Sequence, residues 1–267
     1  MIRYDFLIAG LLFRVETARP LTVPDNFCPF LTKEDFLRKP DILVEVLFGA
    51  APEGLPNVTE RFFWREGEEI VRQEGESCRL YIPESFSEDF CRQGKWLLYL
   101  GLERMLLPRK RLILHASAVI HQGKAYLFSA PSGGGKSTHA ALWQTHYGAK
   151  LLNGDKVVIE VKDGVCMAYG SPVAGSSGIY ENVGAPIAAI FVLHKAKYNQ
   201  LTQLPKRSAL LALYSEAIKC PDDPDFNTKL LDLLQGLQNT VPVFSLECLP
   251  EKGAGDCILT NLEGMTK

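Results

Sequence analysis

The sequence predicts an α/β fold of the α+β kind, in which a mixed-sheet core carries a phosphate-binding glycine loop and a β-rich region precedes it. Three observations predict this class. Short apolar runs between turn residues fill the first third of the chain, which is typical of strands. A strand-like run, a glycine cluster and a helical pattern follow each other at 125–147. Two further helical patterns and a last apolar run occupy the C-terminal third, so helices and strands share one core.

The composition is that of a folded globular protein. Of 267 residues, 46% are hydrophobic and 22% are charged, and the formal net charge is −2. This balance gives no electrostatic reason to expect nucleic acid or an anionic membrane as a partner. Seven cysteines occur without a CxxC pair, and their number is odd. We therefore expect reduced thiols in a cytoplasmic protein and no zinc site.

The apolar run at 6–13 is the segment to weigh as a signal-peptide core or a membrane span. It has eight residues, Asp5 precedes it and no small-residue cleavage site follows it. A membrane-spanning helix needs about 20 apolar residues. We interpret the run as a buried strand and expect no membrane partner.

Residues 1–90 are predicted to form a β-rich region, and residues 91–267 a nucleotide-binding domain. Prolines punctuate the first region and argue against long helices there, because proline removes a backbone donor. The strands expected in this region cover 6–15, 42–48, 61–64, 69–73 and 78–82.

One long helix is expected between Ser85 and Pro108. Ser85 and Glu88 have the spacing of a capping box, and Trp96 and Leu100 lie on one helical face. Pro108 ends the pattern, because proline cannot continue a helix.

The second region begins with two runs, 111–119 and 125–128, that we expect to form a hairpin. The sequence APSGGGKST follows at 130–138, and a helix is predicted at 136–147 with Gly148 as its C-cap. Beyond it we expect strands at 150–161, 188–193 and 243–248, helices at 206–218 and 225–238, and a C-terminal tail.

The segment APSGGGKST is either a surface turn or a cradle for phosphate. Gly135, Lys136 and Ser137 match the end of the pattern G-x-x-x-x-G-K-[S/T], while Ala130 replaces its first glycine. A strand before the loop and a helix after it would bring unsatisfied amides and the positive end of the helix dipole to the loop. This context favours the binding of ATP with Mg²⁺ over a plain turn.

Each residue type of the loop has a chemical role in that interpretation. Glycines let successive N–H groups point inward, and a lysine can reach the β- and γ-phosphates. A serine hydroxyl in the position of Ser137 can bind Mg²⁺. The expected nucleotide-binding residues are Ala130, Pro131, Ser132, Gly133, Gly134, Gly135, Lys136, Ser137 and Thr138.

A carboxylate is needed to hold the metal, and Asp155 lies 18 residues after Ser137. We expect its strand to pair beside the strand that precedes the loop; the alternative is a plain Gly-Asp turn. His115 lies in a strand expected to run beside the same strand, and is either a site residue or a packed structural histidine. Lys136, Asp155 and His115 are thus the candidate catalytic residues, and Ser137 and Asp155 the candidate metal ligands.

Four landmarks, LHASAV, APSGGGKST, LLNGDKVVI and YGSP, follow each other between 111 and 193. Their order and spacing resemble the HPr kinase/phosphorylase family and its looser relatives, which share the nucleotide-binding fold of phosphoenolpyruvate carboxykinase. The resemblance implies a divergent bacterial relative that uses ATP and Mg²⁺ to phosphorylate a hydroxyl. The short interval between the loop and the acidic residue is its discriminating feature, and His115 matches the family histidine before the loop.

The sequence departs from that family at Gly154. Asp155 matches the second residue of the family's Asp-Asp pair, and Gly154 stands where the first, thought to act as base on the acceptor, would be. Three options stay open. Asp155 serves the metal while another group accepts the proton, or Asp155 accepts the proton while Ser137 and the phosphates hold the metal, or the chain binds nucleotide without transfer. A missing base need not abolish phosphoryl transfer, because positioning and charge neutralisation dominate it.

The sequence therefore predicts a kinase that moves the γ-phosphate of ATP to a serine-type hydroxyl of a small molecule, peptide or protein. The alternatives are a nucleotide-binding regulatory module without transfer, and an enzyme of phosphorylase or carboxykinase type. For the last, Lys195 and Lys197 are candidate substrate ligands, although a charged turn explains them equally well. The small-residue segment 169–178 either receives the acceptor or simply connects two elements. The sequence specifies neither the acceptor nor the oligomeric state.

Overall fold

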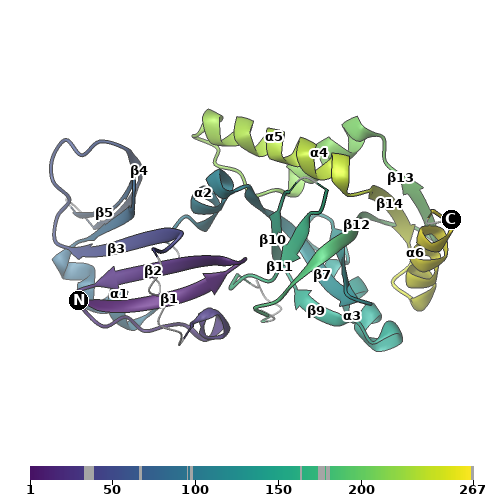
Figure 1. Cartoon of the computed structure of the whole chain (residues 1–267), viewed down its shortest axis with the longest axis horizontal. Coiled ribbons are helices and arrows are strands. Elements are labelled where there is room, and N and C mark those ends of the chain that lie inside the picture. The colour runs from purple at the N-terminus through teal and green to yellow at the C-terminus, as the bar shows by residue number, and fades with distance from the viewer. Residues whose placement is uncertain are drawn as a thin grey trace. The chain divides into compact units, whose positions relative to one another are not determined.

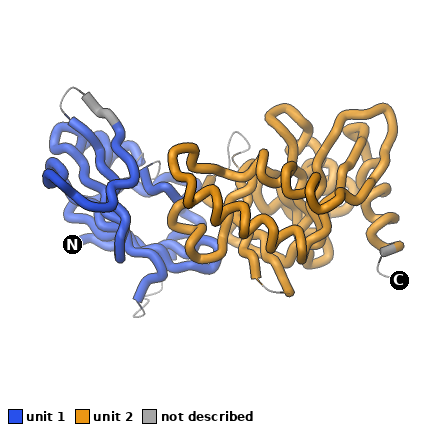
Figure 2. The backbone as a smooth tube through the Cα atoms, turned by 90° about the horizontal axis from the view of Figure 1, so that it is seen from above, with its two compact units in different colours: residues 1–102 blue, residues 103–267 orange. Residues whose placement is uncertain are grey.

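The chain divides into two compact units, Met1–Leu102 and Glu103–Lys267 (Figure 2). The expected division lies between residues 90 and 91. The computed structural model describes residues 1–32, 39–65, 68–94, 96, 99–162, 164–173, 178 and 181–265. Residues 174–177 of the expected loop 169–178 lie outside the described residues.

Trp96 explains why the first unit extends beyond residue 90. Its indole is fully buried, and its ring centroid lies 6.0 Å from that of Phe6 and 6.4 Å from that of Phe27. Its Nε1 donates a hydrogen bond to the carbonyl oxygen of Thr22 at 3.0 Å. Trp96 therefore shares the hydrophobic core of the preceding residues.

A mixed sheet forms the first unit, as the β-rich pattern predicts. Its strands are β1 (Ile2–Ile8), β2 (Leu11–Thr17), β3 (Ile42–Phe48), β4 (Val58–Arg65), β5 (Glu68–Glu74) and β6 (Cys78–Ile82). They follow the order β1-β2-β3-β6-β5-β4. The pairs β2–β3 and β3–β6 are parallel, whereas the pairs on either side of them are antiparallel.

The single strand expected at 6–15 is wrong, because the chain reverses within it. Ala9 and Gly10 have φ of 49° and 76°, and they join β1 to β2 as a hairpin in which Ile8 pairs with Leu11. A two-residue turn with positive φ at both positions matches the twist of paired strands. The apolar pattern runs on across the turn, so Gly10 is the local signal of the reversal.

The long helix expected from Ser85 to Pro108 is also wrong. Gly94 and Gly101 interrupt it with φ of 63° and 60°. A Cβ at Gly101 would lie 1.6 Å from Nη1 of the buried Arg72, so the chain passes Arg72 at a point where no side chain fits. Among the described residues, the helical elements of this stretch include the 3₁₀ segments Glu84–Phe86 and Leu107–Arg109, with α1 (Ser87–Arg92) and α2 (Leu102–Leu106) between them.

The second unit contains a larger mixed sheet. Its strands are β7 (Arg111–His121), β8 (Lys124–Ser129), β9 (Lys150–Asn153), β10 (Lys156–Glu160), β11 (Met167–Tyr169), β12 (Gly184–Lys195), β13 (Gln200–Gln203) and β14 (Val243–Cys248). The order is β11-β10-β7-β8-β12-β14-β13, and β9 pairs with β7 outside this path. β8, β12 and β14 are parallel neighbours, whereas β7 and β8 form the predicted antiparallel hairpin. The sequence did not predict β13.

Helices cover both faces of this sheet, because alternate residues of a strand point to opposite faces. The helices are α3 (Lys136–Tyr147), α4 (Lys206–Glu216), α5 (Pro224–Thr240) and α6 (Lys252–Met265). Leu127 of β8 packs in one core cluster with Leu213 of α4 and Leu234 of α5, which run along one side of the sheet (Figure 1). Its neighbour Phe128 packs in the other cluster with Trp143 of α3 and Ile258 of α6. No described helix has the length and apolar character needed to cross a membrane.

The helix predicted at 136–147 is confirmed, and Gly148 follows it with φ of 62° as the expected C-cap. The C-terminal tail is wrong, because α6 forms there. Gly253 and Gly255 near its start have low helix propensity and hide the helix in the sequence. Gly255 brings α6 close to α3, since a Cβ there would lie 2.5 Å from the Tyr147 side chain.

Candidate functional site

The glycine loop, residues 130–138, connects β8 to α3. Gly133 and Gly135 have φ of 74° and 99°, a backbone conformation that disfavours any residue with a Cβ. A Cβ on Gly134 would lie 2.5 Å from the Cβ of Ala130. Glycine is therefore required at all three positions, twice for backbone conformation and once for close approach.

The first turn of α3 is fixed to the sheet by a buried hydrogen bond. The hydroxyl of Ser117, on β7, donates to the carbonyl oxygen of Lys136 at 2.7 Å. The first amides of a helix lack partners within the helix, and this end carries the positive pole of the helix dipole. Loop and helix together offer amide donors and partial positive charge, which is the arrangement that binds anions at helix N-termini.

Lys136 adds a full positive charge at this end of α3. The residue is 7% exposed, and its Nζ donates to the carbonyl oxygens of Ala130 at 2.7 Å and Pro131 at 3.4 Å. Burial lowers the pKa of Lys136 from its ordinary value, although the carboxylates of Glu216 and Asp155 oppose the shift. Because burial penalises the ammonium, an anion bound beside it would be stabilised strongly.

The side chain of Asn153 fixes the turn that carries Asp155. Its Oδ1 accepts hydrogen bonds from the amides of Asp155 and Lys156, both at 2.8 Å. Its Nδ2 donates to the carbonyl oxygens of Ser171 at 3.1 Å and Val173 at 3.2 Å. Since Asn153 is fully buried, this turn holds Asp155 in one position.

The strand region around Asp155 pairs with β7, not with β8 as expected. β9 and β10 both run antiparallel to β7, and Gly154 and Asp155 separate them. β8 has no free side for this strand, because β7 and β12 already flank it. β7 does run beside β8 as predicted, and its His115 lies opposite Lys156 in the register with β10.

His115 lies between two carboxylates. Its Nε2 is 2.9 Å from Oδ1 of Asp155, and its Nδ1 is 3.2 Å from Oε2 of Glu216. Lys156 donates from Nζ to the other oxygen of Asp155, Oδ2, at 2.7 Å. Burial raises the pKa of Asp155, but the hydrogen bonds and charges of Lys156 and His115 outweigh it and hold the pKa below its ordinary value of 3.8. Asp155 is therefore ionised at neutral pH, with a hydrogen bond on each oxygen.

Besides Lys156, sequence reasoning missed a further member of this cluster, Glu216. It ends α4, and the following residues join the sheet: Ala217 bridges Leu114, and the amide of Ile218 donates to the carbonyl oxygen of Ile113 at 2.9 Å. β10 pairs with one edge of β7 at residues 111–115, and β8 pairs with the other edge only from Ala116 onward. The residues after Glu216 therefore bond to β7 next to the point where β8 ends and the glycine loop begins. An acid in the last turn of a helix opposes the helix dipole, and this local conflict is the signal that could have marked Glu216.

A cavity of about 310 Å³ brings the predicted site residues together. Ala130 and Pro131 do not line it and contribute carbonyl oxygens to Lys136 instead. The cavity joins the loop to two residues distant in sequence, His115 and Asp155. Its lining residues are His115, Ser132, Gly133, Gly134, Gly135, Lys136, Ser137, Thr138, Gly154 and Asp155.

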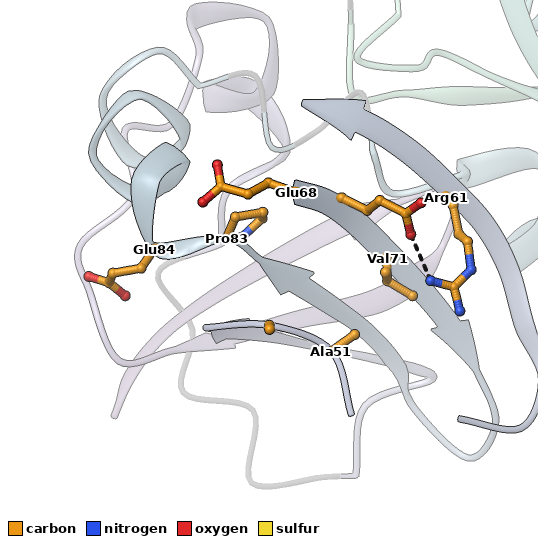
Figure 3. Close-up of a pocket in the computed structure, with 8 residues that line it drawn as sticks. Ala51, Arg61, Glu68, Val71, Pro83 and Glu84 are labelled. Atoms are coloured by element: carbon orange, nitrogen blue, oxygen red, sulfur yellow. Dashed lines mark hydrogen bonds and ion pairs between the residues drawn. The ribbon is translucent and has the colours of Figure 1, made fainter. Parts of the chain in front are cut away.

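A cavity of about 620 Å³ lies in the first unit, where the sequence analysis singled out no site (Figure 3). Arg61 and Glu68 line it from β4 and β5, and Glu84 lies at its edge. Nη1 of Arg61 donates to Oε2 of Glu69 at 2.7 Å, so the guanidinium is paired within the wall. Most of the other lining residues are acidic, small or apolar, which suits phosphate poorly.

The loop residues fit a triphosphate with Mg²⁺. Gly134 leaves no room for a side chain, and Lys136 provides an ammonium. The exposed hydroxyls of Ser137 and Thr138 line the same cavity, and hydroxyl oxygen suits a hard cation such as Mg²⁺. Among the described residues, no group of three or more His, Cys, Asp and Glu side chains is placed to hold a metal.

No protein-family model and no curated protein matches this chain. Among solved structures, it is similar to that of the Hpr(Ser) kinase/phosphatase from Coxiella burnetii. The match covers 58% of this chain and 99% of that chain, at 10% identity and a TM-score of 0.35. This likeness suggests a distant fold relationship only, so the chemistry of the site rests on its own residues.

Proposed function

We propose that this chain is a cytoplasmic phosphotransferase that binds ATP with Mg²⁺ on its glycine loop and transfers the γ-phosphate to a hydroxyl. One observation carries the proposal: the glycine loop, a buried lysine, a serine hydroxyl and an ionised aspartate all line one cavity. A kinase needs these parts together, because phosphoryl transfer depends on positioning and on neutralising phosphate charge. The acceptor is a serine-type hydroxyl of a small molecule, peptide or protein.

The nucleotide is held by the loop and by the start of α3 in this proposal. The amides of the glycine loop and the ammonium of Lys136 bind the β- and γ-phosphates, and Thr138 contacts the α-phosphate. The hydroxyl of Ser137 would serve as a ligand of Mg²⁺. When bound, Mg²⁺ would neutralise charge on the β- and γ-phosphate oxygens.

Asp155 orients the acceptor and takes its proton in this proposal, while Ser137 and the phosphates hold the metal. Lys156 and His115 already occupy one acceptor position on each oxygen of Asp155. An ammonium 2.7 Å from Oδ2 repels a divalent cation on that carboxylate, whereas a hydroxyl can still donate to it.

The acceptor oxygen bonds to the γ-phosphorus, and the bond from that phosphorus to the bridging oxygen breaks. ADP leaves with the electron pair, and the hydroxyl proton passes to Asp155. The low pKa of Asp155 makes it a weak base, which suits a loose transition state in which little proton transfer is needed early.

A second candidate is a nucleotide-binding module without transfer. Gly154 favours it, because the position before Asp155 carries no carboxylate. An enzyme of carboxykinase type has less support: Lys195 and Lys197, the basic residues considered for it, do not line the 310 Å³ cavity. ATP binding without any labelled product would favour the module.

The test measures binding and transfer separately. We expect calorimetry to show binding of ATP with Mg²⁺, and [γ-³²P]ATP to label an acceptor in a bacterial cell extract. Lys136→Met should weaken ATP binding and lower labelling about 10³-fold, because it removes the ammonium from the phosphate site. Asp155→Asn should leave ATP affinity within about threefold and lower labelling about 10²-fold, because it removes only the proton acceptor.

Lys124→Met is the matched control, since Lys124 is exposed at the start of β8. It should behave as the unmodified chain in both assays. The proposal fails if the unmodified chain shows no heat with ATP and Mg²⁺, or if Lys136→Met and Lys124→Met give the same labelling.

A further inference from the structure

Glu216 lies behind the cavity rather than in its wall. Its side chain is 13% exposed, and it is not among the residues that line the 310 Å³ cavity. Its Oε2 lies 3.2 Å from Nδ1 of His115. Glu216 therefore reaches the site through His115, which does line the cavity.

The backbone on both sides of this contact is fixed. The residues after Glu216 are joined to β7 through the Leu114–Ala217 bridge and the amide of Ile218. His115 itself belongs to β7, where it pairs with Lys156 of β10. The carboxylate and the imidazole thus face each other across paired backbone, which gives the contact little freedom to change.

An imidazole ring has two nitrogens, and the hydrogen bond made by one decides how the other is presented. At His115, both nitrogens face carboxylate oxygens, Nδ1 toward Glu216 and Nε2 toward Asp155. The other charged groups near the ring are Lys156, bound to Asp155, and Lys136, which senses the charges of Glu216 and Asp155. Without Glu216, no described contact would hold Nδ1, and the ring could turn away from Asp155.

We propose that Glu216 is a positioning residue of the phosphotransferase site: by accepting a hydrogen bond from Nδ1 of His115, it fixes the ring so that Nε2 holds the Asp155 carboxylate toward the acceptor. This role rests on the proposed function. A carboxylate in the last turn of α4 opposes the helix dipole, so α4 itself gains nothing from Glu216. Local conflicts of this kind are expected where a functional contact outweighs local preference.

The kinetic test compares two substitutions at Glu216. The measured reaction is ATP hydrolysis, in which water accepts the γ-phosphate. Glu216→Leu removes the acceptor and should lower kcat about 10- to 100-fold, while the KM for ATP changes less than about threefold. Glu216→Gln keeps an oxygen that accepts from Nδ1, so its kcat should stay within about fivefold of the unmodified chain. Glu263→Leu, which removes an exposed acid from the last turn of α6, is the matched control and should change neither constant.

A double-mutant cycle separates positioning from general destabilisation. If Glu216 acts through His115, Glu216→Leu should lower kcat by no more than about twofold when His115→Ala is already present. A full 10- to 100-fold loss in that background would overturn the proposal, as would an unchanged kcat in Glu216→Leu alone.

A measurement without nucleotide keeps the proposal testable whatever the activity. In protein with ¹⁵N-labelled histidine, the ring signals of His115, assigned with His115→Phe, should report a proton on Nδ1. They should keep this pattern in Glu216→Gln and lose it in Glu216→Leu. Identical His115 spectra in all three proteins would overturn the positioning role. Absence of ATP binding with the expected spectra would overturn the proposed function instead.

Discussion

The two units of this chain each contain a cavity, and the larger of the two offers less chemistry. The 620 Å³ cavity of the first unit is lined by glutamates, small residues and one arginine that is already paired. The 310 Å³ cavity of the second unit is lined by amide donors, a lysine, hydroxyls, a histidine and an aspartate. The comparison shows that volume is a poor guide to a reactive site, and that convergent polar groups are a better one.

Buried charge is also used differently in the two units. In the first, Arg72 is 1% exposed and is paired within the unit: its Nη2 lies 2.9 Å from Oε2 of Glu60, and its Nε donates to Oγ1 of Thr59 at 3.0 Å. In the second, the ammonium of Lys136 donates to carbonyl oxygens beside the glycine loop. A buried cation that is paired with a carboxylate indicates a structural role, whereas one at the N-terminus of a helix is placed to meet an anion.

The largest expected effect is the loss of stability caused by an alanine at Gly101 of the first unit. Gly101→Ala should lower the free energy of unfolding by about 3 kcal/mol, because the new Cβ strains a backbone with φ of 60° and displaces Arg72 from its buried pairs. Urea denaturation measures this change, and ATP affinity should stay unaltered. Gly54→Ala is the control: φ is 71° there, but nothing lies within 4 Å of the new Cβ, so we expect a loss of only about 1 kcal/mol.

The same substitution in the second unit should act on binding instead. In Gly134→Ala the new Cβ meets the loop's own atoms, Ala130 Cβ at 2.5 Å and the Pro131 carbonyl oxygen at 2.9 Å, so the loop must change shape. We expect calorimetry to show at least about tenfold weaker ATP binding, equivalent to about 1.4 kcal/mol. If Gly101→Ala weakened ATP binding more than Gly134→Ala did, the assignment of stability to Gly101 and of binding to Gly134 would be wrong.

A smaller effect should follow pH in the first unit. Burial raises the pKa of Asp5, but the hydrogen bonds and charges of Arg3 and Arg14 outweigh it and hold the pKa below its ordinary value of 3.8. Because the folded pKa is the lower one, the carboxylate adds stability above pH 3.8 that is lost as the pH falls through the folded pKa. Asp5→Asn should cost about 2 kcal/mol at neutral pH.

That difference should narrow in urea denaturation as the pH falls from 5 to about 3. A gap between Asp5→Asn and the unmodified chain that stays constant down to about pH 3 would contradict the assignment.

The smallest effect is expected in the wall of the larger cavity. Arg61→Ala breaks a pair whose side chains are 51% and 30% exposed, so the unfolding free energy should change by less than about 0.5 kcal/mol. Because this cavity has no part in the proposed transfer, [γ-³²P]ATP labelling should stay within about twofold of the unmodified chain. A loss of labelling comparable to that of Asp155→Asn would move the functional site toward the first unit.

Local features of the second unit could be predicted from the sequence. The hairpin of β7 and β8, the bounds of α3 and the Gly148 cap follow from short-range rules of backbone conformation and periodicity. The glycine loop is likewise local, since its backbone needs glycine wherever φ is positive or space is short. Lys136 and Ser137 could be proposed because they lie in that loop, and Asp155 because it follows Ser137 by only 18 residues.

Contacts between distant segments were decided by the tertiary structure. Glu216 and His115 are 101 positions apart, and no periodicity links them, yet the end of α4 is joined to β7 beside the point where β8 departs. The strands on either side of Asp155 pair with β7 rather than with β8, because β7 and β12 already flank β8. The long helix expected before residue 108 does not form as one piece, because Arg72 of β5 fills the space next to Gly101. The sequence by itself thus determined the backbone conformation of the glycine loop, because the positive φ values there depend on which residues are glycine. Only the tertiary structure decided that Glu216 faces His115, because this contact depends on the end of α4 packing beside β7.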